Sequence, residues 1–183
     1  MNASRRETIE PADAADAYAP LETPIGRLFV AFNGTTVTAV GRTAAAVEAS
    51  LRARFARPAR HVAALPEPLA RAVAEHLHQD GPTRLRFDLG DVPELDQAVL
   101  RAVLGIPRGA VRSYGWVARE IGQPRAAKDV GLALGQNPIP WLIPCHRVVY
   151  RDGQLGGYIF GGRAKRALLL AEGVDLASAA RVA

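Results

Sequence analysis

The hydrophobic pattern changes near residue 90, and this change limits the folds that the chain can adopt. Before it, "TPIGRLFVAFNGTTVTAVGR" places Leu28, Val30 and Phe32 in alternation, and "NGT" supplies a turn, which predicts a β-hairpin. After it, "PELDQAVLRAVLGIP" places Val99 and Val103 on one helical stripe that stops before a proline. We therefore predict an α/β N-terminal domain followed by a mainly α-helical C-terminal domain.

The remaining segments give approximate boundaries to these two parts. "AAVEASLRARFA" and "EPLARAVAEHLHQ" have helical spacing, and "TRLRFDL" is typical of a strand. We predict a flexible tail over residues 1–20, a small α/β domain over 21–90, a helical domain over 91–176 and a second tail over 177–183. The segment "GDVPELDQ" is the expected hinge between the domains.

Two short helices in the second part predict a helix-turn-helix. "SYGWVAREIG" begins at Ser113, a good N-cap, and "QPRAAKDVGLALGQN" follows almost at once, with Gln123 as a possible cap and Pro124 in the first helical position. The outward face of the second helix carries Arg125 and Lys128 among small residues, so its backbone could approach a nucleic-acid groove. An ordinary helical hairpin with a solvated basic face is the alternative.

Composition narrows the choice of partner and compartment. Residues 101–170 contain eleven Arg or Lys against three Asp or Glu, which favours a polyanionic partner, although the Arg-rich composition could also reflect codon bias. The chain has one cysteine, so it forms no internal disulfide and no cysteine-rich zinc site. It has no apolar stretch long enough to span a membrane and no apolar signal core, so we expect a cytoplasmic protein.

The single cysteine lies in "NPIPWLIPCHRVV", residues 137–149. A thiolate is the nucleophilic form of cysteine, and a neighbouring His or Arg stabilises it, so Cys145 beside His146 and Arg147 is a candidate nucleophile. Pro144 fixes φ and favours a rigid turn at this point. A lone cysteine that acts only as a small buried hydrophobe is the alternative.

This segment resembles the active-site signature of the methylated-DNA–protein-cysteine methyltransferases, also called 6-O-alkylguanine-DNA alkyltransferases. The similarity extends through "IPRGAVRSYGWVAREIGQPRAAKDVG" and "GQLGGYIFGGRAKRALLLAEGV" and covers about residues 21–174. The resemblance implies the alkyltransferase fold and direct-reversal DNA repair. In this reaction an alkyl group moves irreversibly, in a single turnover, from a flipped 6-O-alkylguanine in duplex DNA to Cys145.

The resemblance also assigns roles to individual residues. It implies that Cys145 is the nucleophile, that His146 is a base acting through a water, and that Glu172 supports His146. Glu172 ends a helix four residues after Leu168, so it could face inward, or it could be a solvent-facing end residue. The further residues expected in catalysis are Asn137 and Tyr114, those expected to bind the base are Tyr158, Val148 (through its carbonyl), Ile159 and Trp141, and those expected to contact DNA are Ser113, Arg125, Ala126, Ala127, Lys128, Gly131 and Arg147.

No metal and no cofactor is expected, and double-stranded DNA containing alkylated guanine is the expected partner of a monomer that could bind cooperatively. One departure from the family pattern is Lys128, which stands where most members insert an arginine into the base stack, and Arg125 could replace it. A non-catalytic sensor of alkylated bases is therefore the main alternative. A cysteine hydrolase and a transcription regulator are further alternatives.

Overall fold

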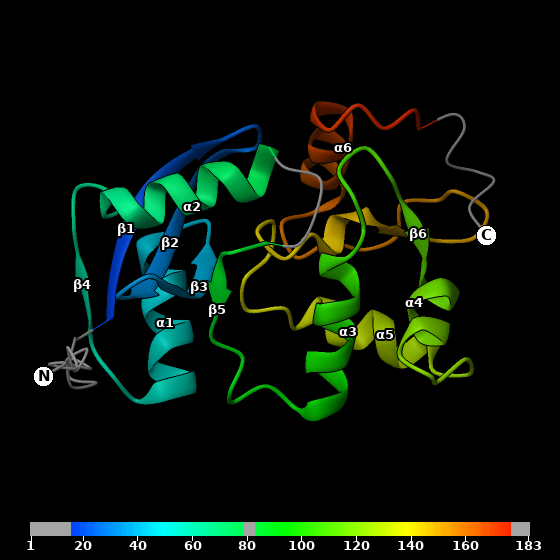
Figure 1. Ribbon diagram of the computed structural model, residues 1–183, viewed down its shortest axis with the longest axis horizontal. Coiled ribbons are helices and arrows are strands. Elements are labelled where there is room, and N and C mark those ends of the chain that lie inside the picture. The colour runs from blue at the N-terminus through cyan, green and yellow to red at the C-terminus, as the bar shows by residue number, and fades with distance from the viewer. Residues whose placement is uncertain (1–15, 79–82, 177–183) are drawn as a thin grey trace, which may run out of the picture.

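The N-terminal half of the molecule is built on a five-stranded sheet. The computed structural model describes residues 16–78 and 83–176. Strands β1 (Asp16–Thr23), β2 (Gly26–Asn33) and β3 (Thr36–Gly41) are antiparallel, and the sheet order is β4-β1-β2-β3-β5 (Figure 1). The short strands β4 (Ala59–His61) and β5 (Arg86–Phe87) pair in parallel with β1 and β3. The predicted hairpin is confirmed as β2 and β3, and Gly34 adopts the positive φ that its turn requires.

Two helices cover opposite faces of this sheet (Figure 1). Helix α1 (Ala44–Phe55) packs Val47 and Leu51 against a cluster that includes Ala31 of β2. Helix α2 (Glu67–His78) packs against the strand residues of the main core, such as Val30. Because successive side chains of a strand point to opposite faces, neighbouring residues of β2 pack against different helices. Both predicted helices are confirmed, and the strand predicted over residues 83–89 shortens to Arg86–Phe87.

The tail predicted for residues 1–20 is wrong for its last five residues. Residues 16–20 belong to β1, and Tyr18 and Ala19 are buried there. Their backbone pairs with β2, and burial of alternate side chains on both sheet faces offsets the entropy of ordering the segment. The rest of this prediction, residues 1–15, and the tail predicted over residues 177–183 lie outside the described residues.

The C-terminal half is mainly helical. Helix α3 (Glu94–Leu104) buries Val99 and Val103 of the predicted stripe, together with Leu100. After it come β6 (Arg112–Ser113), α4 (Tyr114–Glu120), α5 (Ala127–Gly135), the short 3-10 helix η1 (Cys145–Arg147), β7 (Val148–Val149) and α6 (Gly162–Ala171). Strands β6 and β7 pair in parallel and bring the start of α4 close to the residues that follow the cysteine.

Helices α4 and α5 form the predicted helix-turn-helix, with a longer turn than expected. Ser113 caps α4 through its hydroxyl, which accepts a hydrogen bond from the Trp116 backbone N–H at 3.1 Å. The start predicted for the second helix, at Gln123 and Pro124, is wrong, because α5 begins after Ala126. The Gln123 backbone N–H instead bonds the Ala118 carbonyl at 2.8 Å and closes the end of α4.

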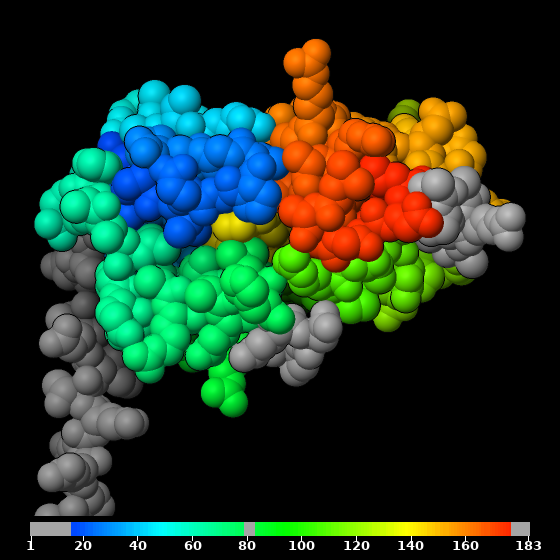
Figure 2. Space-filling view, turned by 90° about the horizontal axis from the view of Figure 1, so that it is seen from above, coloured from blue at the N-terminus to red at the C-terminus, as the bar shows by residue number. Residues whose placement is uncertain are grey.

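The two halves share one hydrophobic core. The main cluster contains Val30 of the sheet, Val73 of α2, Val99 of α3 and Cys145 itself. Figure 2 shows the surface of the N-terminal strands and α1, in blue and cyan, meeting the orange surface of the segment before α6. The expected hinge at "GDVPELDQ" is anchored, because the Arg54 guanidinium bonds Asp91 at 2.6 Å. Among the described helices, none is long and apolar enough to cross a membrane.

Candidate active site

The thiol lies in the wall of a cavity beside the helix-turn-helix. Cys145 begins η1 directly after Pro144, and only 4% of its surface is exposed. The cavity has a volume of about 900 Å³, which is ample for one purine base. It is formed by α4, α5, Cys145 and the segment that follows β7. The residues that line it are Ser113, Tyr114, Gly115, Arg119, Ala127, Lys128, Gly131, Leu132, Leu134, Gly135, Cys145, Tyr150, Arg151, Gly157, Tyr158 and Ile159.

Asn137 holds the turn that carries the thiol. Its Nδ2 donates to the Cys145 sulfur at 3.3 Å and to the Ile143 carbonyl at 3.2 Å, and its Oδ1 accepts from the Ile139 backbone N–H at 2.9 Å. An amide can do this because it both donates and accepts. Asn137 is 1% exposed and follows Gln136, the C-cap residue of α5, so it connects the end of the second helix of the helix-turn-helix to the thiol.

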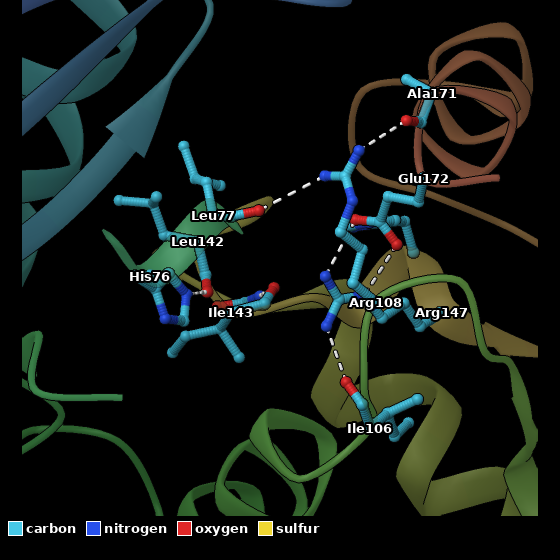
Figure 3. A network of polar contacts seen from close by, with 11 residues as sticks. His76, Leu77, Ile106, Arg108, Leu142, Ile143, Arg147, Ala171 and Glu172 are labelled. Atoms are coloured by element: carbon cyan, nitrogen blue, oxygen red, sulfur yellow. Dashed lines mark hydrogen bonds and ion pairs between the residues drawn. The ribbon is translucent and has the colours of Figure 1, made fainter. Parts of the chain in front are cut away.

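Behind the thiol, His146 and Glu172 form a buried pair. His146 Nε2 lies 2.8 Å from Glu172 Oε1, and the two side chains are 0% and 8% exposed. Arg147 binds the same carboxylate through Nε and Nη2, at 2.8 and 2.9 Å, and donates to the Ile106 carbonyl (Figure 3). Glu172 therefore faces inward at the end of α6, and the solvent-facing alternative is wrong.

The electrostatics of this group define the proton positions. Burial lowers the pKa of His146, against the opposing effect of Glu172, so the ring is neutral at pH 7. Burial raises the pKa of Glu172, but the hydrogen bonds from His146 and Arg147 outweigh it and bring the pKa to about 2. Because the carboxylate only accepts, His146 carries its proton on Nε2. Nδ1 is then a lone-pair acceptor, and it is buried without a hydrogen-bond partner in the described part of the chain.

A buried lysine, Lys165, also acts on the thiol through its charge. Lys165 of α6 is 0% exposed, and its Nζ donates to the carbonyls of Val148, at 2.6 Å, and Gly157, at 3.2 Å. Burial lowers the pKa of this amine to about 8. Burial also raises the pKa of the Cys145 thiol, while the Asn137 hydrogen bond, the Lys165 charge and the Trp141 backbone oppose that rise.

Sequence reasoning missed Lys165, although a signal was present. In "GRAKRALLLA" the lysine lies on the stripe that also carries Ala164, Leu168 and Leu169, all of which are buried. A charged residue on the apolar stripe of a helix is rarely buried unless it is paired. Such a position is therefore a candidate for a site.

Aromatic side chains form much of the rest of the cavity. Tyr114 and Tyr150 lie with ring centroids 5.1 Å apart, and the Tyr158 ring meets the His146 ring edge to face at 6.1 Å. Burial raises the pKa values of Tyr114 and Tyr158, so both keep their phenolic protons at pH 7. A side chain at Gly156 would meet the Tyr114 hydroxyl at 2.7 Å, which explains the glycine.

The segment after Tyr158 is held by the N-terminal half. The Arg42 guanidinium donates to the Phe160 carbonyl at 3.2 Å and lies 5.2 Å from the centre of the Phe160 ring. Ile159 lines the cavity and is 50% exposed, as expected of a residue at its mouth.

Three predicted residues lie elsewhere than expected. Val148 and Trp141 are buried and do not line the cavity, and the Val148 carbonyl already accepts from Lys165. Arg147 was expected to contact DNA, but its guanidinium is bound to Glu172 and Ile106, so the structure corrects this expectation. A bidentate, largely buried arginine is not free to reach a phosphate.

The predicted DNA-contacting residues are grouped around α5. Ala127, Lys128 and Gly131 line the cavity, Ser113 does so from the start of α4, and Lys128 is exposed. Arg125 is exposed in the turn before α5, whereas Ala126 is buried as its N-cap residue. Across the described residues no cluster of metal-ligating side chains occurs.

Comparisons with known proteins identify the family of this chain. The family described as "6-O-methylguanine DNA methyltransferase, DNA binding domain" matches residues 94–174. A Mycobacterium tuberculosis (strain ATCC 25618 / H37Rv) methylated-DNA–protein-cysteine methyltransferase is 38% identical over 152 residues, which cover 83% of this chain and 89% of the relative.

Solved structures of OGT and of a methyltransferase are also similar to this chain. The crystal structure of Mycobacterium tuberculosis OGT in complex with DNA has a TM-score of 0.69 and 32% identity, covering 90% of this chain and 95% of that one. A methyltransferase from Pyrococcus kodakaraensis strain KOD1, 21% identical with a TM-score of 0.67, covers 87% of this chain and 99% of that one and shares the fold.

The fold is that of the alkyltransferase class. The resemblance read from the sequence is confirmed, and the chain belongs to the methylated-DNA–protein-cysteine methyltransferase family.

Proposed function

We propose that the protein repairs DNA by moving an alkyl group from 6-O-alkylguanine to its own Cys145, once per molecule. The observation that carries this proposal is the position of the Cys145 sulfur, which lies in the wall of a base-sized cavity with the His146–Glu172 pair beside it. The base must leave the duplex stack before a protein thiol can reach its substituent.

The reaction is a single displacement at the alkyl carbon. His146 Nδ1 accepts the thiol proton through a water molecule, and Glu172 stabilises the imidazolium that forms. The thiolate attacks the alkyl carbon, a C–S bond forms and the C–O bond to guanine breaks. The leaving oxygen takes a hydrogen bond or a proton from Tyr114, which keeps its phenolic proton. The thioether product is stable, so the protein is consumed.

The wider proposal concerns DNA and the organisation of the chain. Residues 91–176 act as the DNA-binding and active-site domain, and the sheet with α1 and α2 acts as a small N-terminal α/β domain. Helix α5 enters the groove with Ala127, Lys128 and Gly131, and Lys128 fills the space that the flipped base leaves. The protein works in the cytoplasm as a monomer and needs no cofactor.

Mass spectrometry of the intact protein tests the proposal. Incubation with a duplex that carries 6-O-methylguanine is expected to add the mass of one methyl group in place of one hydrogen, once per molecule and on Cys145. Binding without a mass change would identify a sensor of alkylated bases. Repeated turnover on an ester would identify a hydrolase.

A further inference from the structure

The segment that carries the thiol is held from two sides. Asn137 holds its inner side, as described above. On its outer side, two residues of the N-terminal half bond its carbonyls: the Val40 backbone N–H donates to Pro138 at 3.0 Å, and His76 Nε2 lies 2.6 Å from the Leu142 carbonyl oxygen.

These two outer contacts enclose a strained residue. Trp141 has φ of 76°, in the left-handed region that bulky residues rarely adopt. A conformation of this kind persists only where its surroundings hold it. The Trp141 backbone is also one of the groups that oppose the rise in the pKa of Cys145, so its orientation acts directly on the sulfur.

We propose that His76 is a positioning residue for alkyl transfer. Its Nε2 donates to the Leu142 carbonyl and holds the strained turn, and therefore the Cys145 sulfur that follows it, in position. This inference rests on the proposed function. His76 lies at the end of α2, more than sixty residues before the thiol, and Figure 3 shows it facing the Leu142 carbonyl.

The chemistry of the contact fixes the state of the ring. A carbonyl oxygen only accepts, so Nε2 of His76 must carry a proton. The ring is partly buried and packs against Phe87 at 5.7 Å between centroids. Burial lowers the pKa of His76, against the effect of the Leu142 hydrogen bond, and the Arg147 charge lowers it further. The neutral ring with the proton on Nε2 is therefore the form that holds the turn.

The same end of α2 is also joined to the carboxylate side of the site. The Arg108 guanidinium donates to the carbonyls of Leu77, at 3.3 Å, and Ala171, at 2.6 Å (Figure 3). Ala171 precedes Glu172. The end of α2 is thus bonded directly to the turn that carries Cys145 and, through Arg108, to the helix end that carries Glu172, so it can fix their separation.

Two substitutions at His76 separate a hydrogen-bonding role from a packing role. His76→Leu keeps bulk but has no donor, and His76→Gln places an amide donor near the position of Nε2. His78→Leu is the matched control. His78 is exposed at the end of the same helix, and among the described residues its one hydrogen-bond partner is the Ala74 carbonyl of that helix.

The measurement is the single-turnover transfer rate at saturating duplex, together with the half-saturating DNA concentration. His76→Leu is expected to lower the rate roughly 10- to 100-fold, because a small misplacement of a reacting group has effects of that order. The half-saturating concentration should stay unchanged, and His76→Gln should recover most of the rate. An unchanged rate in His76→Leu, or equal losses in the two variants, would overturn the proposal.

A second measurement needs no variant. Nitrogen-15 NMR of the histidine side chains reports which ring nitrogen carries the proton, and a proton on Nε2 of His76 is expected at neutral pH. A proton on Nδ1 alone would refute the inference, even if His76→Leu fails to fold. Failure of the wild-type protein to transfer an alkyl group would instead refute the proposed function. The NMR result does not depend on transfer, so the two failures can be told apart.

Discussion

The buried network around Cys145 and the exposed face of α5 are built in opposite ways. Behind the thiol, Lys165 and His146 are 0% exposed and have fixed hydrogen-bond partners. On the face of α5 that we propose binds DNA, Leu132 is 57% exposed and Lys128 is exposed. The chemistry is therefore organised before DNA arrives, whereas the contacts with DNA form on binding.

The largest expected effect separates the two regions completely. Cys145→Ser removes the nucleophile and should abolish transfer, because a serine hydroxyl has far too high a pKa to react here. The exposed face of α5 is unchanged, so affinity for duplex DNA should stay at the wild-type level. Intact mass and fluorescence anisotropy measure the two properties. If affinity falls together with transfer, the two regions are not separable in this way.

Glu172→Gln tests how strongly the network is held together. The folded pKa of Glu172 is about 2 against the ordinary value of 4.5, so its ionised form stabilises the fold above pH 4.5, and that stability is lost as the pH falls toward 2. The variant should lose on the order of 3 kcal/mol in the free energy of unfolding at pH 7. Its transfer rate should fall roughly 100-fold, because His146 loses its partner.

Urea denaturation of both proteins at several pH values measures this difference. The gap between wild type and Glu172→Gln should be constant from pH 7 to 5 and should narrow below pH 4.5. A gap that does not depend on pH would mean that the charge of Glu172 contributes nothing to stability.

Lys165→Met should have a smaller effect on the rate. The variant loses the positive charge that favours the thiolate, and a rise of about one unit in the thiol pKa would slow transfer roughly 10-fold at pH 7. The pH profile of transfer should move to higher pH. Arg166→Met, on the exposed side of the same helix, is the control and should keep the wild-type profile. Identical pH profiles of transfer for the wild type, Lys165→Met and Arg166→Met would show that the Lys165 charge has no effect on the thiol.

The smallest expected effect belongs to the exposed face. Lys128→Ala should weaken repair of duplex by a few-fold while leaving the reaction with the free modified base unchanged. The salt dependence of DNA affinity should lose about one unit of slope, since one phosphate-neutralising cation is removed. Arg125→Ala, in the turn before α5, is the comparison. Equal losses on duplex and free base would show that Lys128 belongs with the buried network.

The sequence predicted the parts of the site that depend on local chemistry. The "PCHRVV" segment, the cap at Ser113 and the helix-turn-helix all follow from neighbouring residues. The structure places Cys145, Tyr114 and Tyr158 in the wall of one cavity. Asn137 bonds Cys145, and Glu172 bonds His146. Prediction failed where a distant partner decides the outcome. Arg147 carries the charge expected of a DNA contact, but Glu172, twenty-five residues away, binds it.

By itself, the sequence determined the family, the candidate nucleophile, the β2–β3 hairpin and most of the helices, because hydrophobic periodicity, caps and turns act over a few residues. Only the tertiary structure decided which charges are buried and which backbone groups hold the thiol. Lys165, His76 and Arg42 reach the site from separate elements. Their roles depend on distances that are set by tertiary packing, and these distances cannot be derived from the spacing of residues along the chain.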